Sequence, residues 1–135
     1  MKMERKEPYA SQGDYAKYVV RYADVPPIEL APGFQTHIVS GDRITFSFVS
    51  AEPSAKLSSH NHENEQLMIV IDGAVDFVIA GKQYHVEKSD VVVLPSNTEH
   101  GGYISDKGCR VIDVFSPRRQ DFMAKLEEAK KSQKK

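Results

Sequence analysis

Apolar and polar residues alternate in short runs along most of this chain, and turn residues separate the runs. Residues 34–39 and 44–50 alternate with a period of two, which predicts two strands that each have one buried face. Further short strands are predicted over 18–22, 66–71, 75–79, 83–86, 91–94, 101–104 and 110–115. This rhythm, with no helical pattern before residue 117, predicts an all-β protein: an antiparallel double sheet or barrel of jelly-roll type.

Two turn signals and one unbroken apolar run refine this picture. Asp72-Gly73 and Ala80-Gly81 predict tight turns between strands. Residues 66–71 are almost continuously apolar, which is typical of a strand with both faces covered. Residues 44–50 separate Ile44, Phe46 and Phe48 on one face from Thr45 and Ser47 on the other.

A helix is predicted at the C-terminal end. Ser116 fits the N-cap and Pro117 the first helical position. Phe122, Leu126 and Ala129 recur at helical spacing, so this helix packs across the outside of the barrel. We therefore expect an N-terminal arm over 1–17, a β-barrel over 18–116, and a helix and tail over 117–135.

Composition narrows the class of protein. The 135 residues suffice for one domain, and the net charge of −1 without a basic stripe argues against a nucleic-acid partner. The sequence contains no run of about 18 apolar residues, and we expect no membrane segment. The charged start lacks the apolar core of a secretory signal, and Cys109 is the single cysteine. Both features fit a cytoplasmic protein.

The stretch around His60 carries the clearest chemical signal. His60 and His62 are two residues apart and project from the same face of a strand, and Gln66 joins them if the strand continues. His100 follows 38 residues after His62. Together they predict a site for one divalent transition metal, Ni, Zn, Fe or Mn. Because the amide of Gln66 is neutral, the ion keeps its +2 charge and suits Lewis-acid chemistry; alternatively, Gln66 hydrogen-bonds a metal-bound water.

A second candidate site lies near residue 113. An aspartate in an apolar strand is costly to bury unless it is paired or functional, so Asp113 is a candidate general acid or base. Arg118 or Arg119, at the end of the strand, is placed to bind a substrate carboxylate. The alternative is a structural Asp–Arg ion pair that ties the helix to the barrel.

These motifs resemble those of a known superfamily. The pattern His60-x-His62-x3-Gln66-x6-Gly73, followed by Pro95-x-Asn97-x2-His100, resembles the two motifs of the cupins. The resemblance implies a double-stranded β-helix, the cupin barrel. The chain departs from the pattern where Gln66 replaces the usual glutamate, and where Ser89 and Asn97 replace glycines. With glutamine at this position, the motif resembles that of non-redox cupins, which isomerise or rearrange their substrates.

The segment 112–122 is similar to that of the small uronate-processing cupins, often called pectin degradation proteins. These convert 4,5-unsaturated uronates into linear keto sugars. The resemblance implies catalytic roles for Asp113 and Arg119, a pocket aromatic at Phe115 and a homodimer. It also supports His60, His62, Gln66 and His100 as the metal ligands. We expect Phe115 and Arg118 to bind the substrate.

Three functions from different classes follow from these features. The first is a metal-dependent isomerase that opens and ketonises a small anionic sugar acid such as a 4,5-unsaturated uronate. The second is an Fe(II)-dependent cupin dioxygenase, because three neutral histidines can hold Fe(II) without a carboxylate. The third is a non-catalytic sugar-binding cupin.

Overall fold

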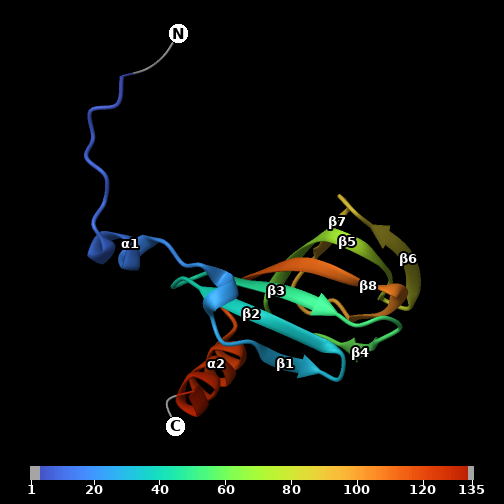
Figure 1. Ribbon diagram of the computed structural model, residues 1–135. Helices are drawn as coiled ribbons and strands as arrows, with labels where there is room; N and C mark the ends of the chain where they lie inside the picture. Colours follow the sequence, from blue (N-terminus) through green and yellow to red (C-terminus); the bar gives the residue numbers. More distant parts are fainter. Residues whose placement is uncertain (1–3, 134–135) are drawn as a thin grey trace.

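Two long strands, β5 and β8, lie side by side through the centre of the molecule and take part in both of its sheets (Figure 1). The computed structural model describes residues 4–133 of the chain. In it β5 spans Glu65–Ile79 and β8 spans His100–Ser116. They pair antiparallel along nearly their whole length, from Glu65 opposite Ser116 to Ile79 opposite His100.

The other described elements pack around this pair. In chain order they are α1 (Gln12–Tyr18), the 3-10 helix η1 (Tyr22–Asp24), β1 (Ile28–Ala31), β2 (Phe34–Ser40), β3 (Thr45–Ala51), β4 (Lys56–His60), β6 (Lys82–Glu87), β7 (Val91–Leu94) and α2 (Gln120–Gln133). The first sheet contains, in spatial order, β1, β2, β3, the second half of β8, the first half of β5, and β7. The second sheet contains β4, the first half of β8, the second half of β5, and β6. Every pairing is antiparallel, which confirms the predicted all-β double sheet.

Both central strands bend where they pass from one sheet to the other. The prediction of a tight turn at Asp72-Gly73 is wrong. The chain continues through Gly73 within β5, where the pairing with β8 shifts register. Gly73 has a φ of +77°, and a Cβ there would clash with the carbonyl oxygen of Gly108 and lie 2.9 Å from Cα of Cys109. Likewise, the two strands predicted over 101–104 and 110–115 are one strand, β8. Bulges of this kind bend a strand without ending it.

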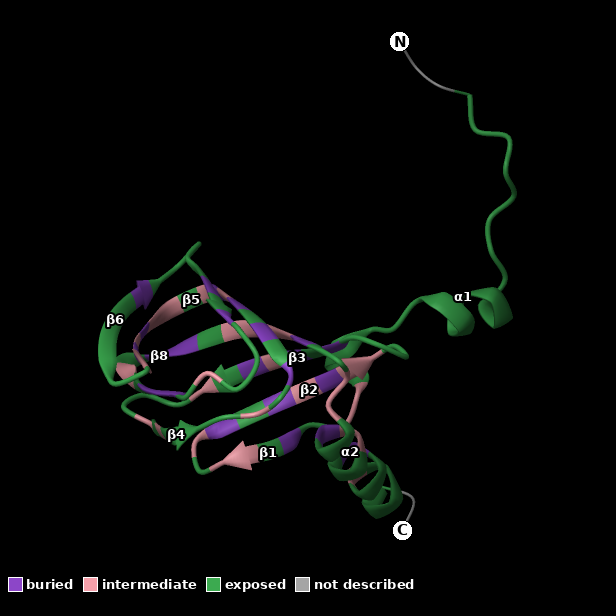
Figure 2. Ribbon diagram, turned by 180° about the vertical axis from the view of Figure 1, so that it is seen from behind, coloured by how far each residue is buried: buried purple, intermediate pink, exposed green. Residues whose placement is uncertain are grey.

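The N-terminal arm differs from the prediction. The strand expected over 18–22 is wrong; Gln12–Tyr18 form α1, and a single 3-10 turn follows at η1. The side chains of Ser11 and Asp14 cap α1 reciprocally, which favours a helix locally. No residue of α1 is buried, and residues 4–24 are all exposed (Figure 2). The first three residues of the predicted arm lie outside the described range.

The C-terminal helix forms, but it begins later than predicted. Ser116 still pairs with Glu65 in the β5–β8 ladder and lies four residues before the helix, so it is not the N-cap. Helix α2 starts at Gln120 instead. Its buried residues Phe122 and Leu126 pack in a cluster with neighbouring strand residues, with Ala129 against it, which confirms the predicted apolar stripe. None of the described helices is long and apolar enough to cross a membrane.

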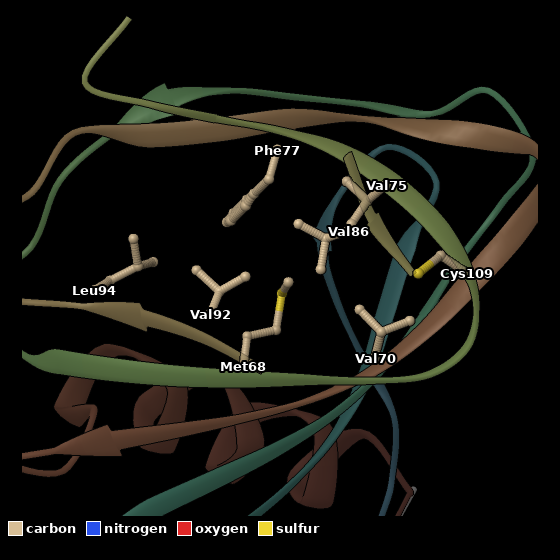
Figure 3. Close-up of a cluster of buried hydrophobic side chains, with 8 residues drawn as sticks. All are labelled: Met68, Val70, Val75, Phe77, Val86, Val92, Leu94 and Cys109. Atoms are coloured by element: carbon tan, nitrogen blue, oxygen red, sulfur yellow. The ribbon is translucent and has the colours of Figure 1, made fainter. Parts of the chain in front are cut away.

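The space between the sheets holds the main core. Its side chains come from β5, β6, β7 and β8 and point toward one another in Figure 3: Met68, Val70, Val75, Phe77, Val86, Val92, Leu94 and Cys109. Burial raises the pKa of the Cys109 thiol to about 11, so the thiol stays protonated at neutral pH. The inner face of β2 and β3 carries buried polar side chains among its apolar ones: Thr36 and Ser47 are fully buried and join by a 2.6 Å hydrogen bond.

The close approach at Gly73 predicts a large effect of a single methyl group. We expect Gly73→Ala to lower the free energy of unfolding by about 3 kcal/mol or more, because left-handed strain adds to the backbone clash. Gly81→Ala is the matched control: its φ is +83° but no atom lies within 4 Å of the added Cβ, so it carries the strain alone, about 1 kcal/mol. Urea unfolding of the two variants measures the difference, and equal losses would contradict the predicted clash.

Candidate metal centre

Three histidines from separate parts of the chain bring their rings together. His60 ends β4, His62 lies in the following loop, and His100 begins β8 opposite His60 in the ladder. One ring nitrogen from each lies within 4.8 Å of the others. Metal–imidazole bonds of about 2.1 Å place ligand nitrogens at most ~4.2 Å apart, so small ring rotations close the remaining gap. The arrangement fits a single ion.

The three residues His60, His62 and Gln66 do not meet on one face of a continuous strand, as the sequence predicted they would. The strand ends at His60, and residues 61–64 form a loop before β5 brings in Gln66, which is buried. The loop is tied from both sides. The side-chain amide of Asn64 donates to the carbonyl of Pro117 at 2.5 Å, and the backbone N–H of Asn97 donates to the carbonyl of His62 at 2.8 Å. These bonds fix the position of the His62 ring.

The backbone also sets the tautomer of each ring. In all three histidines Nδ1 lies within 2.8–2.9 Å of a backbone carbonyl oxygen: Ser58 for His60, Asn64 for His62 and Thr98 for His100. A carbonyl oxygen only accepts, so Nδ1 carries the hydrogen and Nε2 keeps its lone pair. Metal-binding histidines commonly have this second hydrogen bond, which fixes the ring and its tautomer.

Electrostatics keeps two of these rings neutral. Burial lowers the pKa of His100 to about 4, and the nearby charges of the other histidines and of Arg119 act in the same direction. The pKa of His62 is also lowered, first by burial and then by Arg119. Neutral imidazole is the form that binds metal, so at neutral pH these two rings are ready to ligate.

Gln66 completes the group with an oxygen. Its Oε1 lies 3.0 Å from Nε2 of His62, and its Nε2 donates to Oδ1 of Asp113 at 2.9 Å. With the hydrogen of His62 on Nδ1, two lone-pair atoms face each other across 3.0 Å, and neither has a hydrogen to share. A cation bound by both atoms removes this conflict. The donor set of three neutral nitrogens and one amide oxygen therefore fits a divalent transition metal.

Asp113 lies on the cavity side of β8, opposite Met68 of β5. Burial raises the pKa of its carboxyl to about 7, while the hydrogen bond from Gln66 and the charge of Arg119 act in the opposite direction. Its bond to Gln66 has a structural consequence as well. A carboxylate attracts the NH2 end of the amide, so Asp113 turns the oxygen of Gln66 toward the histidines.

Arg119 is held in place from several directions. Its Nε and Nη2 donate to the two carboxylate oxygens of Asp121 at 3.0 and 2.8 Å. The guanidinium lies 3.9 Å from the ring centroid of Phe122 and 4.8 Å from that of Phe115. Only Nη1 has no hydrogen bond among the described residues. The sequence left open a structural ion pair between Asp113 and one of the two arginines; in the structure Arg119 pairs with Asp121 instead.

The other two predicted site residues lie differently. Phe115 is buried and meets the His62 ring edge-on at 5.6 Å between centroids, so it supports both His62 and Arg119. Arg118 does not line the cavity in the part of the chain that the structure describes. The residue next to it does, because the chain turns at 117–119 and the backbone N–H of Arg119 donates to Oγ1 of Thr45.

A cavity of about 460 Å³ opens beside this group, between the two sheets and α2. Its polar walls include His60, Gln66, His100, Asp113 and Arg119. Three further charged residues line it that the sequence did not single out: Lys56, Asp121 and Lys125. The sequence could have indicated Asp121, because it follows Arg119 by two residues and can pair with it. Nothing in the sequence indicated the two lysines. The volume suits a small molecule rather than a polymer.

Comparison with known proteins agrees with this architecture. The family model described as Cupin domain matches residues 47–115. The pectin degradation protein KdgF of Dickeya dadantii (strain 3937) is 28% identical over 102 residues, which are 74% of this chain and 93% of that protein.

Solved structures give the same result. The structure of KdgF from Halomonas sp. is 31% identical, with a TM-score of 0.67, and the match covers 71% of this chain and 89% of that one. An RmlC-like cupin from Shewanella frigidimarina has a TM-score of 0.72 at 20% identity, covering 78% and 95% of the two chains, which shows the shared fold. The double sheet and the matched motifs confirm the resemblance drawn from the sequence, and the chain belongs to the cupin family.

Proposed function

We propose that this protein is a metal-dependent isomerase that opens and ketonises a small anionic sugar acid, with a 4,5-unsaturated uronate as the leading candidate. The observation that carries the proposal is the Gln66 amide, which directs its oxygen to the histidines and its nitrogen to Asp113. Gln66 thereby links the neutral metal ligands to the carboxyl group of Asp113 on one wall of the cavity. The similarity to pectin degradation proteins supports the substrate class.

His60, His62, His100 and the oxygen of Gln66 would hold one divalent transition metal. All four ligands are neutral, so the bound ion would keep its +2 charge and would polarise a substrate oxygen as a Lewis acid. A carboxylate ligand would reduce that charge. The replacement of the usual glutamate by Gln66 therefore favours isomerisation over the oxidative chemistry of the dioxygenase alternative.

The proton transfer is assigned to Asp113 by elimination within the cavity. Two carboxyl groups line the described part of its wall, Asp113 and Asp121. Asp121 accepts two hydrogen bonds from Arg119, and that pairing lowers its pKa, so it stays ionised and engaged. Asp113 is left to take a proton from a hydroxyl and deliver one to carbon during ring opening and ketonisation.

Arg119 would bind the substrate carboxylate through its remaining edge. Asp121 uses Nε and Nη2, and the two phenylalanine rings fix the guanidinium plane, which leaves Nη1 for an incoming carboxylate. Lys56 and Lys125 add positive charge on the cavity wall. An anionic ligand of small size is therefore favoured over a neutral one.

Metal binding tests the ligand set directly. We expect one divalent ion per chain, and we expect His100→Ala to weaken binding about a hundredfold or more, because it removes one ligand from the set. His85→Ala is the matched control, since His85 is exposed, is bonded to Asp76 and Glu87, and lies outside the cavity lining. Calorimetric titration with Ni²⁺ and Zn²⁺ measures both affinities. Equal affinities for the two variants would contradict the site.

Substituting Asp113 by asparagine tests its role in proton transfer separately from its hydrogen bond with Gln66. Asp113→Asn keeps an oxygen that can accept from Gln66 but removes the carboxyl group. We expect metal affinity close to that of the natural chain and a loss of activity of about a hundredfold or more. The readout is the fall of the enol absorbance of an unsaturated galacturonate.

Two results would contradict this function. One is a fully metal-loaded natural chain that gives no acceleration over buffer with the unsaturated uronate. The other is Fe(II)-dependent oxygen consumption on adding a diol or thiol substrate, which would favour the dioxygenase. If Asp113→Asn left both activity and ligand affinity unchanged, a binding-only cupin would be favoured.

The substrate carboxylate is tested at Arg119. We expect Arg119→Lys to raise KM at least about tenfold and to change kcat much less, because lysine lacks the planar fork that fits a carboxylate. Arg118→Lys is the matched control on the neighbouring residue, which lies outside the cavity lining, and its KM should match that of the natural chain. Steady-state kinetics on the same uronate distinguishes the two variants, and an equal KM in both would exclude Arg119 as the carboxylate site.

A further inference from the structure

Asn64 is a buried polar residue to which the proposed function gives no role. It lies in the loop between β4 and β5, between the proposed ligands His62 and Gln66, and it is 7% exposed. An amide is costly to bury unless its polar groups find hydrogen-bond partners. The partners of Asn64 therefore indicate its role.

The two ends of Asn64 hold two different parts of the site. Its backbone carbonyl accepts the Nδ1–H of His62 at 2.9 Å. Its side-chain amide donates to the carbonyls of Pro117 and Arg118, at 2.5 and 3.4 Å. A carbonyl oxygen only accepts, so both contacts require the NH2 group of an asparagine. One residue thus joins a metal ligand to a segment that begins 53 positions later.

That segment leads directly into Arg119. The carbonyl of Arg118 belongs to the same peptide group as the N–H of Arg119, and this N–H donates to Oγ1 of Thr45 at 2.9 Å. The peptide group is therefore held on one side by Asn64 and on the other by Thr45, and both of these side chains are buried. Residues 117–119 lie between the end of β8 and the start of α2. The two side chains thus position the backbone from which the arginine extends.

From these contacts we infer that Asn64 is a positioning residue that couples the metal centre to Arg119. When His62 ligates a metal, its ring and the carbonyl that holds the ring lose freedom to move. The side chain of the same asparagine transmits this restraint to the backbone before Arg119. Coupling of two binding sites is reciprocal, so an anion bound at Arg119 tightens metal binding by the same factor.

The inference rests on the proposed function for the ligand that Arg119 takes, and on the four-ligand site for the metal. The coupling itself requires no reaction. A chain that binds metal and orders Arg119 in response would couple the two sites whatever substrate it accepts. The two ideas can therefore be tested separately.

A second route connects the same two sites through Phe115. Its ring lies edge-on to that of His62, with 5.6 Å between centroids, and the Arg119 guanidinium lies 4.8 Å from its centroid. Ring contacts are favourable over a range of centroid distances, whereas hydrogen bonds are confined to a few tenths of an ångström. The route through Asn64 is therefore the stiffer one, and removing it should abolish most of the coupling.

Hydrogen exchange at the backbone N–H of Arg119 measures the coupling without any substrate. We expect saturating Zn²⁺ to slow this exchange about tenfold or more in the natural chain, because the segment opens less often when the loop is fixed. Asn64→Ala keeps the backbone carbonyl that holds His62 but removes the bonds to 117–118, and Zn²⁺ should slow its exchange less than about twofold. The amides of β6, which lies outside the cavity lining, report the change due to overall stability in each variant.

Ser96→Ala is the matched control. The Ser96 hydroxyl donates to the carbonyl of Glu63, so this variant also removes one hydrogen bond from the same loop, but not one that leads to Arg119. Its response to Zn²⁺ should equal that of the natural chain. Thermal unfolding checks that each variant is folded, and Asn64→Ser, whose hydroxyl is too short to replace the amide, repeats the test if the alanine variant is not.

Kinetics on the unsaturated uronate gives a second readout. Asn64→Ala should raise KM about tenfold and change kcat much less, whereas Ser96→Ala should leave KM unchanged. Equal Zn²⁺ responses in Asn64→Ala and the natural chain would overturn the inference, as would a variant that loses thermal stability alone. Coupling in a metal-loaded chain that is inactive on the uronate would support the inference and contradict the proposed function.

Discussion

The close contact between β5 and β8 at their bends is the constraint on which the rest of the structure depends. Gly73 lies so near Gly108 and Cys109 that any side chain would separate the two strands. Because both strands cross from one sheet to the other at this point, they carry residues of both sheets to the same cavity. Gln66 and Asp113 arrive from the first sheet, and His100 arrives from the second. The site lies between the sheets because two shared strands line it.

Within the site, neutral groups are held in place by the backbone. Each histidine donates Nδ1–H to a backbone carbonyl, which is less mobile than a side chain, so the rings are oriented before any ion binds. The Gln66 amide is oriented in the same way by Asp113. A metal bound here would remain a strong Lewis acid, because Asp113, the carboxyl that orients its oxygen ligand, stands outside the ligand set.

Local patterns predicted the elements and the ligands, but not the long-range contacts. The His60–Gln66 stretch and His100 were found because ligand types are few and their spacing is specific. The start of α2 was misplaced because local capping preferences favour Ser116, whereas pairing with Glu65 keeps that residue in β8. The bend at Gly73 depends on contact with Gly108, 35 positions away, and the residue types at a local turn do not reveal such a contact. Strand β4 lacks an apolar alternation and forms only because β8 lies beside it.

The buried polar residues and the outward apolar residues of β3 have a common origin. In β3, Thr45 and Ser47 point inward, where Thr45 accepts the backbone N–H of Arg119 and Ser47 lies opposite Asp113 in the ladder. Because side chains alternate along a strand, placing these polar groups beside the site forces Phe46 and Phe48 to the outside. The same alternation that builds a polar cavity wall therefore exposes an apolar face.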